Sequence, residues 1–585
     1  MANEAVGPAS VPIDSALVSP SPLRLWPAWL IGAAQPVVLV LNVTPSIHID
    51  TRLAFMVLGP LVSALLISTW VMIASGLRRW EKSALAAAGI VCPVVSLLVS
   101  LPEDALRATL WIYGVPLAVI MVTVGLSVRS RSPRRSILAI GLLGIGWGSF
   151  AFLRNEGFEG DYFPQFAWRW SPRHEDTLPA LENPAGPAPA SAADAPADSL
   201  SWPQFRGPAG NASVSDEITP QDWAAKPPKE LWRIPVGPGW SSFSHDKGRL
   251  FTQEQRREDE CITCYSALDG RLIWSHADET RFSEVVSGAG PRSTPSVADG
   301  CVYALGGRGL LTCLNDADGT VVWQRNLVRE LKAPVPTWGF SGSPLILGDK
   351  LVVFAGAPGN EGLIALDRLT GRILWGFPST DTNYTTARPM TFANEECVVF
   401  CDGRGVHALA PDTGSPRWTY KPKLWNGPPL IDPQQLSQSS LLVGLGEAVG
   451  LTRLEVGKSG GTWSVEESWT TTRLRSSFND MVVLDDCVYG FNQSVFVCFD
   501  AKTGERKWQG GRYGFGQAVL LRNPAQIIVT AENGDAVLLR ATPERLDEIA
   551  RIPVLHDKTW NHPIVVGDRL FLRNGKTAVC LQLNP

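Results

Sequence analysis

The sequence carries few charged side chains for its length. Asp, Glu, Lys and Arg make up 18% of the 585 residues, against roughly 25% in ordinary soluble domains. Positive charge is not in surplus, because the formal net charge is -4. A nucleic-acid-binding protein needs a basic surface that neutralises phosphates. The low charge argues against a wholly water-soluble chain, and the missing basic surplus argues against nucleic acid as the main partner.

The shortage of charge is concentrated before residue 155. Five stretches contain no Asp, Glu, Lys or Arg, and each has about the length at which a helix crosses some 30 Å of hydrocarbon. They are Leu25–Ile47, Leu53–Leu77, Ser83–Pro102, Ala108–Val128 and Ser136–Leu153. No Ala-x-Ala-like processing sequence follows the first stretch. We therefore predict five transmembrane helices within residues 25–153, preceded by a cytoplasmic segment at 1–24.

The segments that flank these stretches differ in positive charge. One side collects eight Lys and Arg residues, whereas the other collects three, at Arg52, Arg107 and Arg154. Because short loops rich in Lys and Arg stay in the cytoplasm, the richer side is predicted to be cytoplasmic. Five crossings then place the chain after residue 154 on the outer side of the membrane.

Residues 154–200 differ from both halves of the chain. Phe163, Phe166, Trp168 and Trp170 surround Arg169 soon after the last predicted helix. Aromatic residues of this kind are enriched at membrane interfaces, although chance aromatic content explains them equally well. Residues 179–198 are rich in Pro and Ala, a composition typical of a semi-extended tether.

Residues 201–585 repeat one pattern. An alternating apolar strand, a turn with glycine and a second strand ending in tryptophan recur at Trp274, Trp323, Trp375, Trp418, Trp469 and Trp508, with a degenerate copy at Ile549. Spacings that scatter around 45 residues are typical of four-stranded β-propeller blades. We expect the glycine to supply the positive φ of the turn and the tryptophan to pack between neighbouring sheets.

The last unit, residues 560–583, supplies only three strands. ELWRIPV at 230–236 has the character of an outer strand but follows no repeat of its own. Pairing these two segments closes the ring and removes two exposed sheet edges. We therefore predict an all-β, eight-bladed propeller whose eighth blade combines strands from both ends of the domain.

The repeat, with its Asp or Thr, Gly and Trp, resembles the propeller repeat of pyrroloquinoline quinone (PQQ) proteins over residues 200–585. WPQFRGP at 202–208 resembles the opening segment of membrane-anchored or exported bacterial propellers with PQQ-like repeats. The resemblance implies a bacterial inner membrane and a periplasmic propeller. It includes both quinoprotein alcohol dehydrogenases and BamB, the non-enzymatic propeller lipoprotein of the outer-membrane β-barrel assembly machinery, so it implies the fold more than the function.

Two features of these relatives are missing. Quinoprotein dehydrogenases hold an adjacent Cys–Cys disulfide against the cofactor, but none of the ten cysteines here is next to another. The assembly lipoprotein is held by a lipidated N-terminal cysteine, whereas Cys92, the only cysteine of the membrane half, lies inside the third stretch. We therefore predict a binding or scaffold module for envelope proteins, with a PQQ-dependent periplasmic oxidoreductase as the alternative.

The segments before the innermost strands of a propeller converge at one mouth of its channel. The candidate binding residues there are Trp240, Arg292, Trp338, Arg388, Trp425, Asn479, Asp480, Gln517, Trp560, Asn561 and His562. Arginine with flat aromatic rings suits a planar polyanion such as PQQ, and Asn479 with Asp480 offers oxygen ligands to Ca²⁺. We favour a structural alternative. In it, the polar residues form the hydrogen bonds of the inner turns, and the tryptophans pack the narrowing part of the channel. No catalytic residue, metal site or cofactor is therefore predicted, and PQQ with Ca²⁺ stays a candidate only.

Histidine and cysteine add little chemistry. His562 lies in the proposed channel, but no carboxylate is paired with it by sequence, so no acid–base mechanism follows. Cys261 and Cys264 are interpreted as small core residues, because strand positions three apart face opposite sides. A hairpin centred on Asn492-Gln493 places Cys487 opposite Cys498, and an oxidising compartment then makes this pair the one candidate disulfide.

Overall fold

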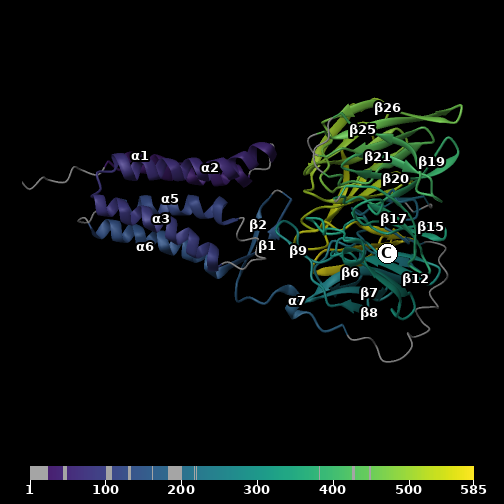
Figure 1. Cartoon of the computed structure of the whole chain (residues 1–585), viewed down its shortest axis with the longest axis horizontal. Helices are drawn as coiled ribbons and strands as arrows, with labels where there is room; N and C mark the ends of the chain where they lie inside the picture. The colour runs from purple at the N-terminus through teal and green to yellow at the C-terminus, as the bar shows by residue number, and fades with distance from the viewer. Residues whose placement is uncertain are drawn as a thin grey trace, which may run out of the picture. The chain divides into compact units, whose positions relative to one another are not determined.

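The computed structural model describes residues 24–43, 49–99, 109–128, 133–160, 162–181, 201–215, 218, 221–380, 382–423, 428–446 and 449–584. It divides into two compact units. The first contains the residues up to Glu156 together with Phe166–Trp170, and the second contains Gly157–Gln165 and the chain from Ser171 onward. Figure 1 shows the first unit in purple and blue and most of the second in teal to yellow. The predicted tether at 179–198 lies almost wholly outside the described residues.

The first unit is a bundle of apolar helices. They are α1 (Trp26–Val43), α2 (Ile49–Thr69) continued by η1 (Trp70–Ala74), α3 (Arg79–Val99), η2 (Leu110–Gly114) continued by α5 (Val115–Ser127), and α6 (Arg134–Ser149) continued by η3 (Phe150–Phe152). Four described stretches are long and apolar enough to cross a membrane, namely Ala54–Ile73, Arg79–Val99, Leu110–Ser127 and Arg134–Phe152. The prediction of five transmembrane helices is confirmed only in part. The apolar part of α1 covers Trp26–Leu41, which at 1.5 Å per residue is shorter than a hydrocarbon core.

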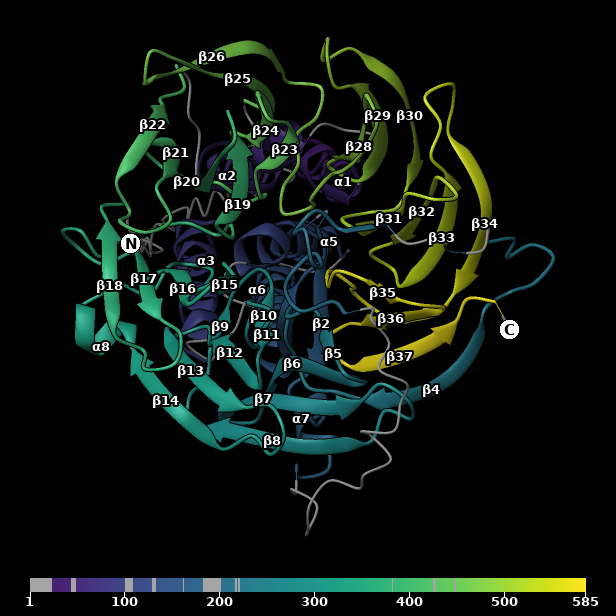
Figure 2. The same cartoon turned by 90° about the vertical axis from the view of Figure 1, so that its right-hand side faces the viewer.

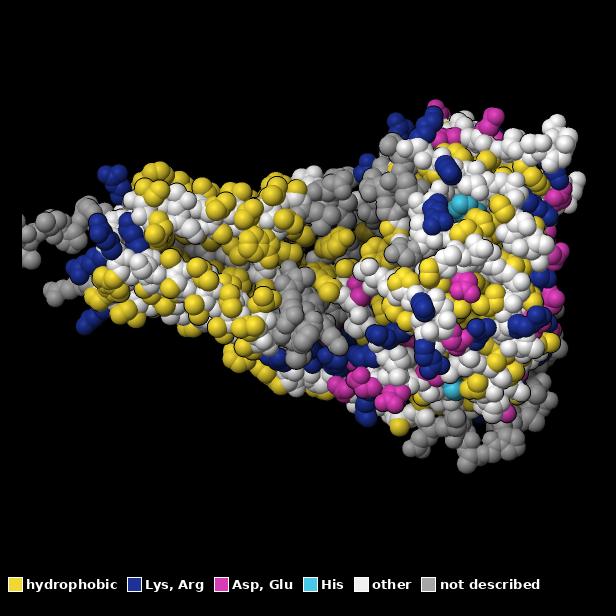
Figure 3. Space-filling model, viewed as in Figure 1, with side chains coloured by type: hydrophobic (Ala, Val, Ile, Leu, Met, Phe, Trp, Pro, Cys, Tyr) yellow, Lys and Arg dark blue, Asp and Glu magenta, His cyan; other side chains and the backbone are white. Residues whose placement is uncertain are grey.

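α3 and α6 run side by side in the same direction. Near their starts, the Ser136 hydroxyl donates to the Glu81 carboxylate at 2.8 Å. Near their ends, the Arg169 guanidinium donates to the carbonyl oxygens of Val99 at 3.0 Å and Ala151 at 3.2 Å. The starts of both helices carry basic residues, which therefore gather at one end of the unit: Arg78, Arg79, Lys82, Arg134 and Arg135. Figure 3 shows the basic end and the hydrophobic flanks of the helices.

Aromatic side chains gather at the other end of α3 and α6. Trp168 and Trp170 stack with their ring centroids 5.1 Å apart, and Phe152 packs edge-on against Trp170 at 6.0 Å. All three rings are more than half exposed. Phe166 contacts Tyr113 within the same unit, whereas Phe163 belongs to the second unit. An exposed aromatic cluster at the ends of apolar helices is typical of residues that lie at a membrane interface.

The second unit is a ring of eight antiparallel sheets (Figure 2). The eighth sheet joins β35 (Ile564–Val566), β36 (Arg569–Arg573) and β37 (Thr577–Gln582) to β4 (Lys229–Pro235), where Cys580 pairs with Trp232. The predicted closure by residues 230–236 and the count of eight blades are both confirmed. The seventh sheet gains a fifth strand, β3 (Ser213–Val214), which pairs in parallel with β31 (Gln517–Leu521).

The other seven blades are consecutive in the chain, each with its innermost strand first. Their remaining strands are β5 (Ser244–Asp246), β6 (Arg249–Arg256), β7 (Asp259–Ser266) and β8 (Leu272–Asp278); β11 (Ser296–Ala298), β12 (Cys301–Leu305), β13 (Leu310–Asn315) and β14 (Val321–Asn326); β15 (Leu345–Leu347), β16 (Lys350–Phe354), β17 (Leu363–Asp367) and β18 (Ile373–Phe377); β19 (Arg388–Phe392), β20 (Glu395–Asp402), β21 (Gly405–Leu409) and β22 (Pro416–Tyr420); β23 (Gln434–Ser437), β24 (Ser440–Gly444), β25 (Leu451–Ser459) and β26 (Thr462–Thr471); β27 (Val482–Leu484), β28 (Cys487–Asn492), β29 (Val495–Asp500) and β30 (Arg506–Arg512); and β32 (Gln526–Thr530), β33 (Asp535–Arg540) and β34 (Asp547–Pro553). Outside the blades lie β1 (Leu153–Phe158), β2 (Pro164–Trp168), α7 (His174–Thr177), β9 (Ser283–Glu284), β10 (Gly288–Ala289) and α8 (Leu327–Leu331).

The glycine and the tryptophan of the repeat meet across neighbouring blades. Gly319 has φ +74, and a Cβ atom on it would lie 2.6 Å from the Trp274 ring of the preceding blade. The Trp274 indole also donates to the Asp316 carbonyl oxygen of the same turn at 2.8 Å. Trp232, Trp323 and Trp375 bond to the next blade in the same way. The repeat thus encodes both a turn with positive φ and the contact between blades.

The register of β28 and β29 corrects the predicted pairing of Cys487 with Cys498. The turn lies one residue later than predicted, so that Tyr489 faces Cys498 and Cys487 faces Asp500. Diagonal neighbours in a sheet have Cα atoms about 7–8 Å apart, beyond the usual disulfide range. Both cysteines are free thiols.

Cys261 and Cys264 are buried free thiols in β7 whose pKa values are raised by burial, so they stay protonated and unreactive.

Candidate functional site

Hydrogen bonds join the innermost segments of neighbouring blades. In six successive blades, one backbone amide donates to the side chain of the equivalent residue in the next blade: Ser242 to Thr294 (2.9 Å), Thr294 to Ser343 (3.0 Å), Ser343 to Thr386 (3.0 Å), Thr386 to Asp432 (2.7 Å) and Asp432 to Asp480 (2.9 Å). The Ser242 hydroxyl donates to the carbonyl oxygen of His562 in the eighth blade at 2.7 Å. We call these seven residues the inner ring.

Three predicted site residues supply the hydrogen bonds between the remaining neighbouring blades. Their side-chain amides donate to backbone carbonyl oxygens of the next blade: Asn479 to Gly516 (2.6 Å), Gln517 to Trp560 (3.2 Å) and Asn561 to Ser241 (2.7 Å). All three side chains are buried. Because a buried carbonyl oxygen without a donor is costly, these amides hold the blades together. This structural role, between neighbouring blades, differs from the bonding within inner turns that the sequence suggested as the alternative to ligand binding.

Ionised side chains meet inside the ring. Arg388 donates twice to Asp432, with its Nε atom 2.8 Å from the carboxylate. Asp480 lies 3.5 Å from the Arg206 guanidinium and 3.4 Å from His562 Nε2, and all five side chains are buried. Burial alone would raise the pKa of Asp480, but Arg206 and His562 hold it below its usual value. Burial lowers the pKa of His562, although the neighbouring Asp480 carboxylate opposes this shift.

The cation beside Asp480 comes from outside the repeats. Arg206 belongs to the segment Trp202–Gly210, which runs across the inner strands. Trp202 bridges to His245 of the first blade, Phe205 accepts from Arg388 at 3.0 Å, and Arg206 donates to the carbonyl oxygen of Met481. The Phe205 ring also stands edge-on to the His562 ring, with centroids 4.8 Å apart. The segment therefore crosses the centre of the ring and places its own backbone and charge there.

Sequence reasoning missed two members of this cluster. It nominated Arg388, Asp480 and His562 but not Arg206 or Asp432. Asp432 occupies the same repeat position as Asp480, so aligning the inner segments would have found it. Arg206 lies in WPQFRGP, and its only signal is a basic residue within an otherwise uncharged segment. The carboxylate beside His562, which the sequence could not identify, is Asp480.

This arrangement does not fit PQQ with Ca²⁺. Calcium takes six to eight oxygen ligands, and among the residues that the structure describes no group of three or more His, Cys, Asp or Glu side chains could hold a metal. Arg206 repels a second cation beside Asp480. Arg388 already forms an ion pair with Asp432 and is therefore engaged, not free for a quinone carboxylate.

Large side chains line the mouth of the channel. Five of them stand two positions before inner-ring residues: Trp240, Arg292, Tyr384, Phe478 and Trp560. Ring centroids of neighbours are close, at 4.9 Å for Trp240 and Trp560, 4.7 Å for Phe478 and Trp560, 5.9 Å for Phe478 and Phe515, and 4.9 Å for Trp338 and Tyr384. The sequence missed Tyr384, Phe478 and Phe515, although the spacing of two would have found the first two.

The mouth has a covered half and an open half. In the covered half, Trp560 and Phe515 are buried. In the open half, Trp338 is 37% exposed beside Tyr384. The Arg292 side chain is only 7% exposed and is engaged, because it donates to the Ser287 hydroxyl at 2.7 Å and to the Gly288 carbonyl oxygen at 2.8 Å. Trp425 lies outside the described residues.

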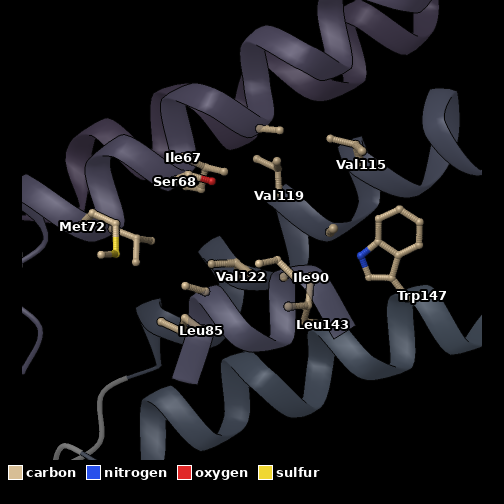
Figure 4. A pocket seen from close by; sticks show the side chains of 15 residues that line it. Ile67, Ser68, Met72, Leu85, Ile90, Val115, Val119, Val122, Leu143 and Trp147 are labelled. Atoms are coloured by element: carbon tan, nitrogen blue, oxygen red, sulfur yellow. The ribbon is translucent and has the colours of Figure 1, made fainter. Parts of the chain in front are cut away.

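The helical unit contains a separate cavity of about 290 Å³ (Figure 4). It lies among α2, η1, α3, α5 and α6, with Val119, Val122 and Leu143 among its walls. Ser68 and the Trp147 indole supply its polar groups, and the other lining side chains are apolar. The cavity therefore offers no carboxylate, imidazole or amine for catalysis.

Comparisons with known proteins agree with this architecture. A family model described as outer membrane protein assembly factor BamB matches residues 258–509. BamB from Moraxella catarrhalis is 17% identical with a TM-score of 0.43, and the match covers 61% of this chain and 99% of that one. A quinohemoprotein alcohol dehydrogenase from Comamonas testosteroni is 12% identical with a TM-score of 0.52, covering 68% of this chain and 84% of that one. No curated protein matches the sequence. The second unit is a PQQ-like, BamB-like propeller, and at such identities the structural likeness shows the fold alone.

Proposed function

We propose that this protein is a membrane-anchored scaffold that binds other envelope proteins through the open half of its propeller mouth. One observation carries the proposal: the segment Trp202–Gly210 crosses the centre of the ring, and Arg206 pairs with Asp480 there. The charges that a quinone or calcium would need are thus engaged within the chain. Trp338 is exposed and Tyr384 partly exposed at the mouth, and tryptophan and tyrosine are among the residues that contribute most to protein interfaces.

The location belongs to the same proposal. The basic end of the helical unit faces the cytoplasm of a bacterial inner membrane, since positively charged loops stay there, and the aromatic end lies at the outer interface. The propeller follows α6, which starts at the basic end, so it is periplasmic whether or not α1 crosses. With α1 crossing, five spans leave the N-terminus in the cytoplasm, and with four spans the N-terminus is periplasmic.

Site-specific photocrosslinking tests the binding surface. A photoreactive amino acid replaces Trp338 or Tyr384 in the full-length protein in its native membrane, and Leu369 serves as the control. Leu369 is 61% exposed on the turn between β17 and β18, away from the mouth. Adducts with one identified envelope protein are expected at 338 and 384 but not at 369. Equal adducts at all three positions would contradict a specific surface at the mouth.

The oxidoreductase alternative predicts a different measurement. Full-length protein is titrated with PQQ in the presence and absence of Ca²⁺, and no saturable change in quinone absorbance is expected. Calcium-dependent saturation that is lost on Asp480→Asn would overturn the scaffold function and favour quinone chemistry.

A further inference from the structure

The covered half of the mouth contains a segment of the chain itself. Gly157–Gly160 lies there, and three of its hydrogen bonds join it to the propeller. The Phe158 amide donates to the Val286 carbonyl oxygen at 2.7 Å, Lys558 Nζ donates to the Phe158 carbonyl oxygen at 2.8 Å, and the Gly160 amide donates to the Glu532 carboxylate at 2.6 Å. All three use backbone atoms of the segment, so another peptide with the same backbone path can form them.

The positions of Gly157, Phe158 and Gly160 nevertheless accept only particular residues. Phe158 is only 4% exposed and its ring centroid lies 6.5 Å from that of Tyr162, so a segment on this path buries one aromatic ring at this position. Gly157 has φ +127, and its Cβ would lie 2.9 Å from the Val286 carbonyl oxygen. A Cβ on Gly160 would lie 2.0 Å from the Phe515 ring. The cleft therefore selects glycine, an aromatic residue and glycine at the first, second and fourth positions, and Glu159 at the third brings a negative charge toward Lys558.

The groups that form the cleft are held by contacts of their own. The Glu532 carboxylate accepts from the Trp560 indole at 2.8 Å and from the Phe515 amide at 3.1 Å. The Lys558 ammonium lies 4.5 Å from the Trp560 ring and 5.1 Å from the Trp240 ring. Glu532 and Lys558, which bond the segment, therefore have partners within the propeller as well, so the polar groups of the cleft are preorganised for a ligand.

We propose that this cleft is a binding site for an extended Gly-aromatic-x-Gly segment of a partner protein, and that Gly157–Gly160 occupies it as an internal ligand until the partner displaces it. The proposal rests on the scaffold function above and names the chemistry of the partner. Backbone hydrogen bonds supply the general affinity, and the single buried aromatic ring supplies the specificity. Trp338 and Tyr384 offer the partner a first contact beside the occupied cleft.

An internal ligand competes with an added one through its high effective concentration, so expelling it raises the affinity for a peptide. The probe is a fluorescent synthetic peptide of residues 155–163, titrated against the full-length protein in detergent. Phe158→Ala and Gly160→Ala change only the internal segment, the second through a clash with Phe515. Each variant is expected to bind the probe at least tenfold more tightly than the wild type. Equal affinity in the wild type and both variants overturns the proposal.

Matched controls identify the binding site of the probe. A peptide with alanine in place of Phe158 is expected not to bind the Gly160→Ala protein. Adding Glu532→Ala to that protein is expected to remove most of the tenfold gain, whereas adding Leu369→Ala keeps it. In the wild type, excess probe is expected to speed hydrogen exchange of the Phe158 amide, and unchanged exchange at saturating probe also overturns the proposal. This last measurement does not depend on the folding of any variant.

The two proposals fail separately. Probe binding without specific adducts at positions 338 and 384 would support the proposed cleft and contradict the scaffold function at the open half. Specific adducts without the tenfold gain would keep the scaffold function but remove the internal ligand.

Discussion

The two units of this chain distribute their polar groups in opposite ways. The propeller buries Arg206, Arg388, Asp432 and Asp480 at its centre, where they neutralise one another. The helical unit keeps its charges near its two ends and exposes apolar flanks between them, with Ile73 77% and Leu98 75% exposed. Water suits the outside of the propeller, and hydrocarbon suits the apolar flanks of the helical unit. The same chain is therefore built for two solvents.

The two units also differ in how their stability is distributed. A propeller closed by a ring of hydrogen bonds and ion pairs depends on single residues, because removing one partner leaves the other buried and unpaired. The helices are held mainly by apolar packing, which is spread over many weak contacts. Substitutions at the centre of the propeller should therefore cost more than substitutions in the helices.

The largest effect is expected for Arg206→Ala. It leaves the buried Asp480 carboxylate without its guanidinium partner, so that only the Asp432 amide and His562 remain beside it. Breaking a buried pair costs about 3–5 kcal/mol. Chemical unfolding of the full-length protein, followed by tryptophan fluorescence, measures the loss. Lys502→Ala is the control, because its ion pair with Asp486 is exposed and is expected to contribute about 0.5 kcal/mol. Equal losses for both variants would show that the central ion pair contributes no more to the free energy of unfolding than an exposed one.

The second effect depends on pH. Burial raises the pKa of Glu260 to about 7, although the Gly307 amide and Arg292 oppose this. The unfolded carboxyl titrates near 4.3, so the folded protein binds the extra proton between these values. This contribution to the free energy of unfolding is complete below pH 4 and is lost as the pH rises through 7, on the order of 3 kcal/mol. Glu260→Gln is expected to flatten the profile between pH 4 and 7, and an unchanged profile would contradict this assignment.

The third effect separates backbone strain from contact between blades. Gly319→Ala adds both a strained positive φ and a clash with Trp274, and a loss of about 3 kcal/mol is expected. Gly348 is the matched control, because it has φ +59 and its Cβ would meet no atom within 4 Å. Gly348→Ala should cost about 1 kcal/mol. If thermal melts of the two variants coincide, the tryptophan contact contributes nothing.

The smallest effect is expected in the helical unit and has the opposite sign. Gly89 lines the cavity in α3, and a Cβ there would meet no atom within 4 Å. Gly89→Ala should therefore stabilise the helix by about 0.5–1 kcal/mol. Gly125→Ala is the contrasting variant, because its Cβ would lie 2.4 Å from Ala139 Cα. Melting temperatures in one detergent should rise for the first and fall for the second, and a fall in both would mean that the cavity is not open space.

The sequence by itself determined the repeat, the closure and the apolar helices. Turn glycines, alternating apolar residues and charge-free stretches act through short-range sterics and periodicity, and these can be followed along one strand or helix. The pairing of residues 230–236 with 577–583 was predictable because only these segments lacked a partner. The count of helices was less secure, because α1 falls near the length limit for a span.

Only the tertiary structure decided which charges meet and what covers the mouth. Arg206 and Asp480 are 274 positions apart, and Phe158 and Lys558 are 400 apart, so no local pattern connects them. A one-residue shift of a turn was enough to move Cys487 from Cys498 to Asp500. The physical reason is that periodicity specifies the conformation of a segment, whereas the partners of a buried charge or an inserted loop depend on the path of the chain through the whole ring.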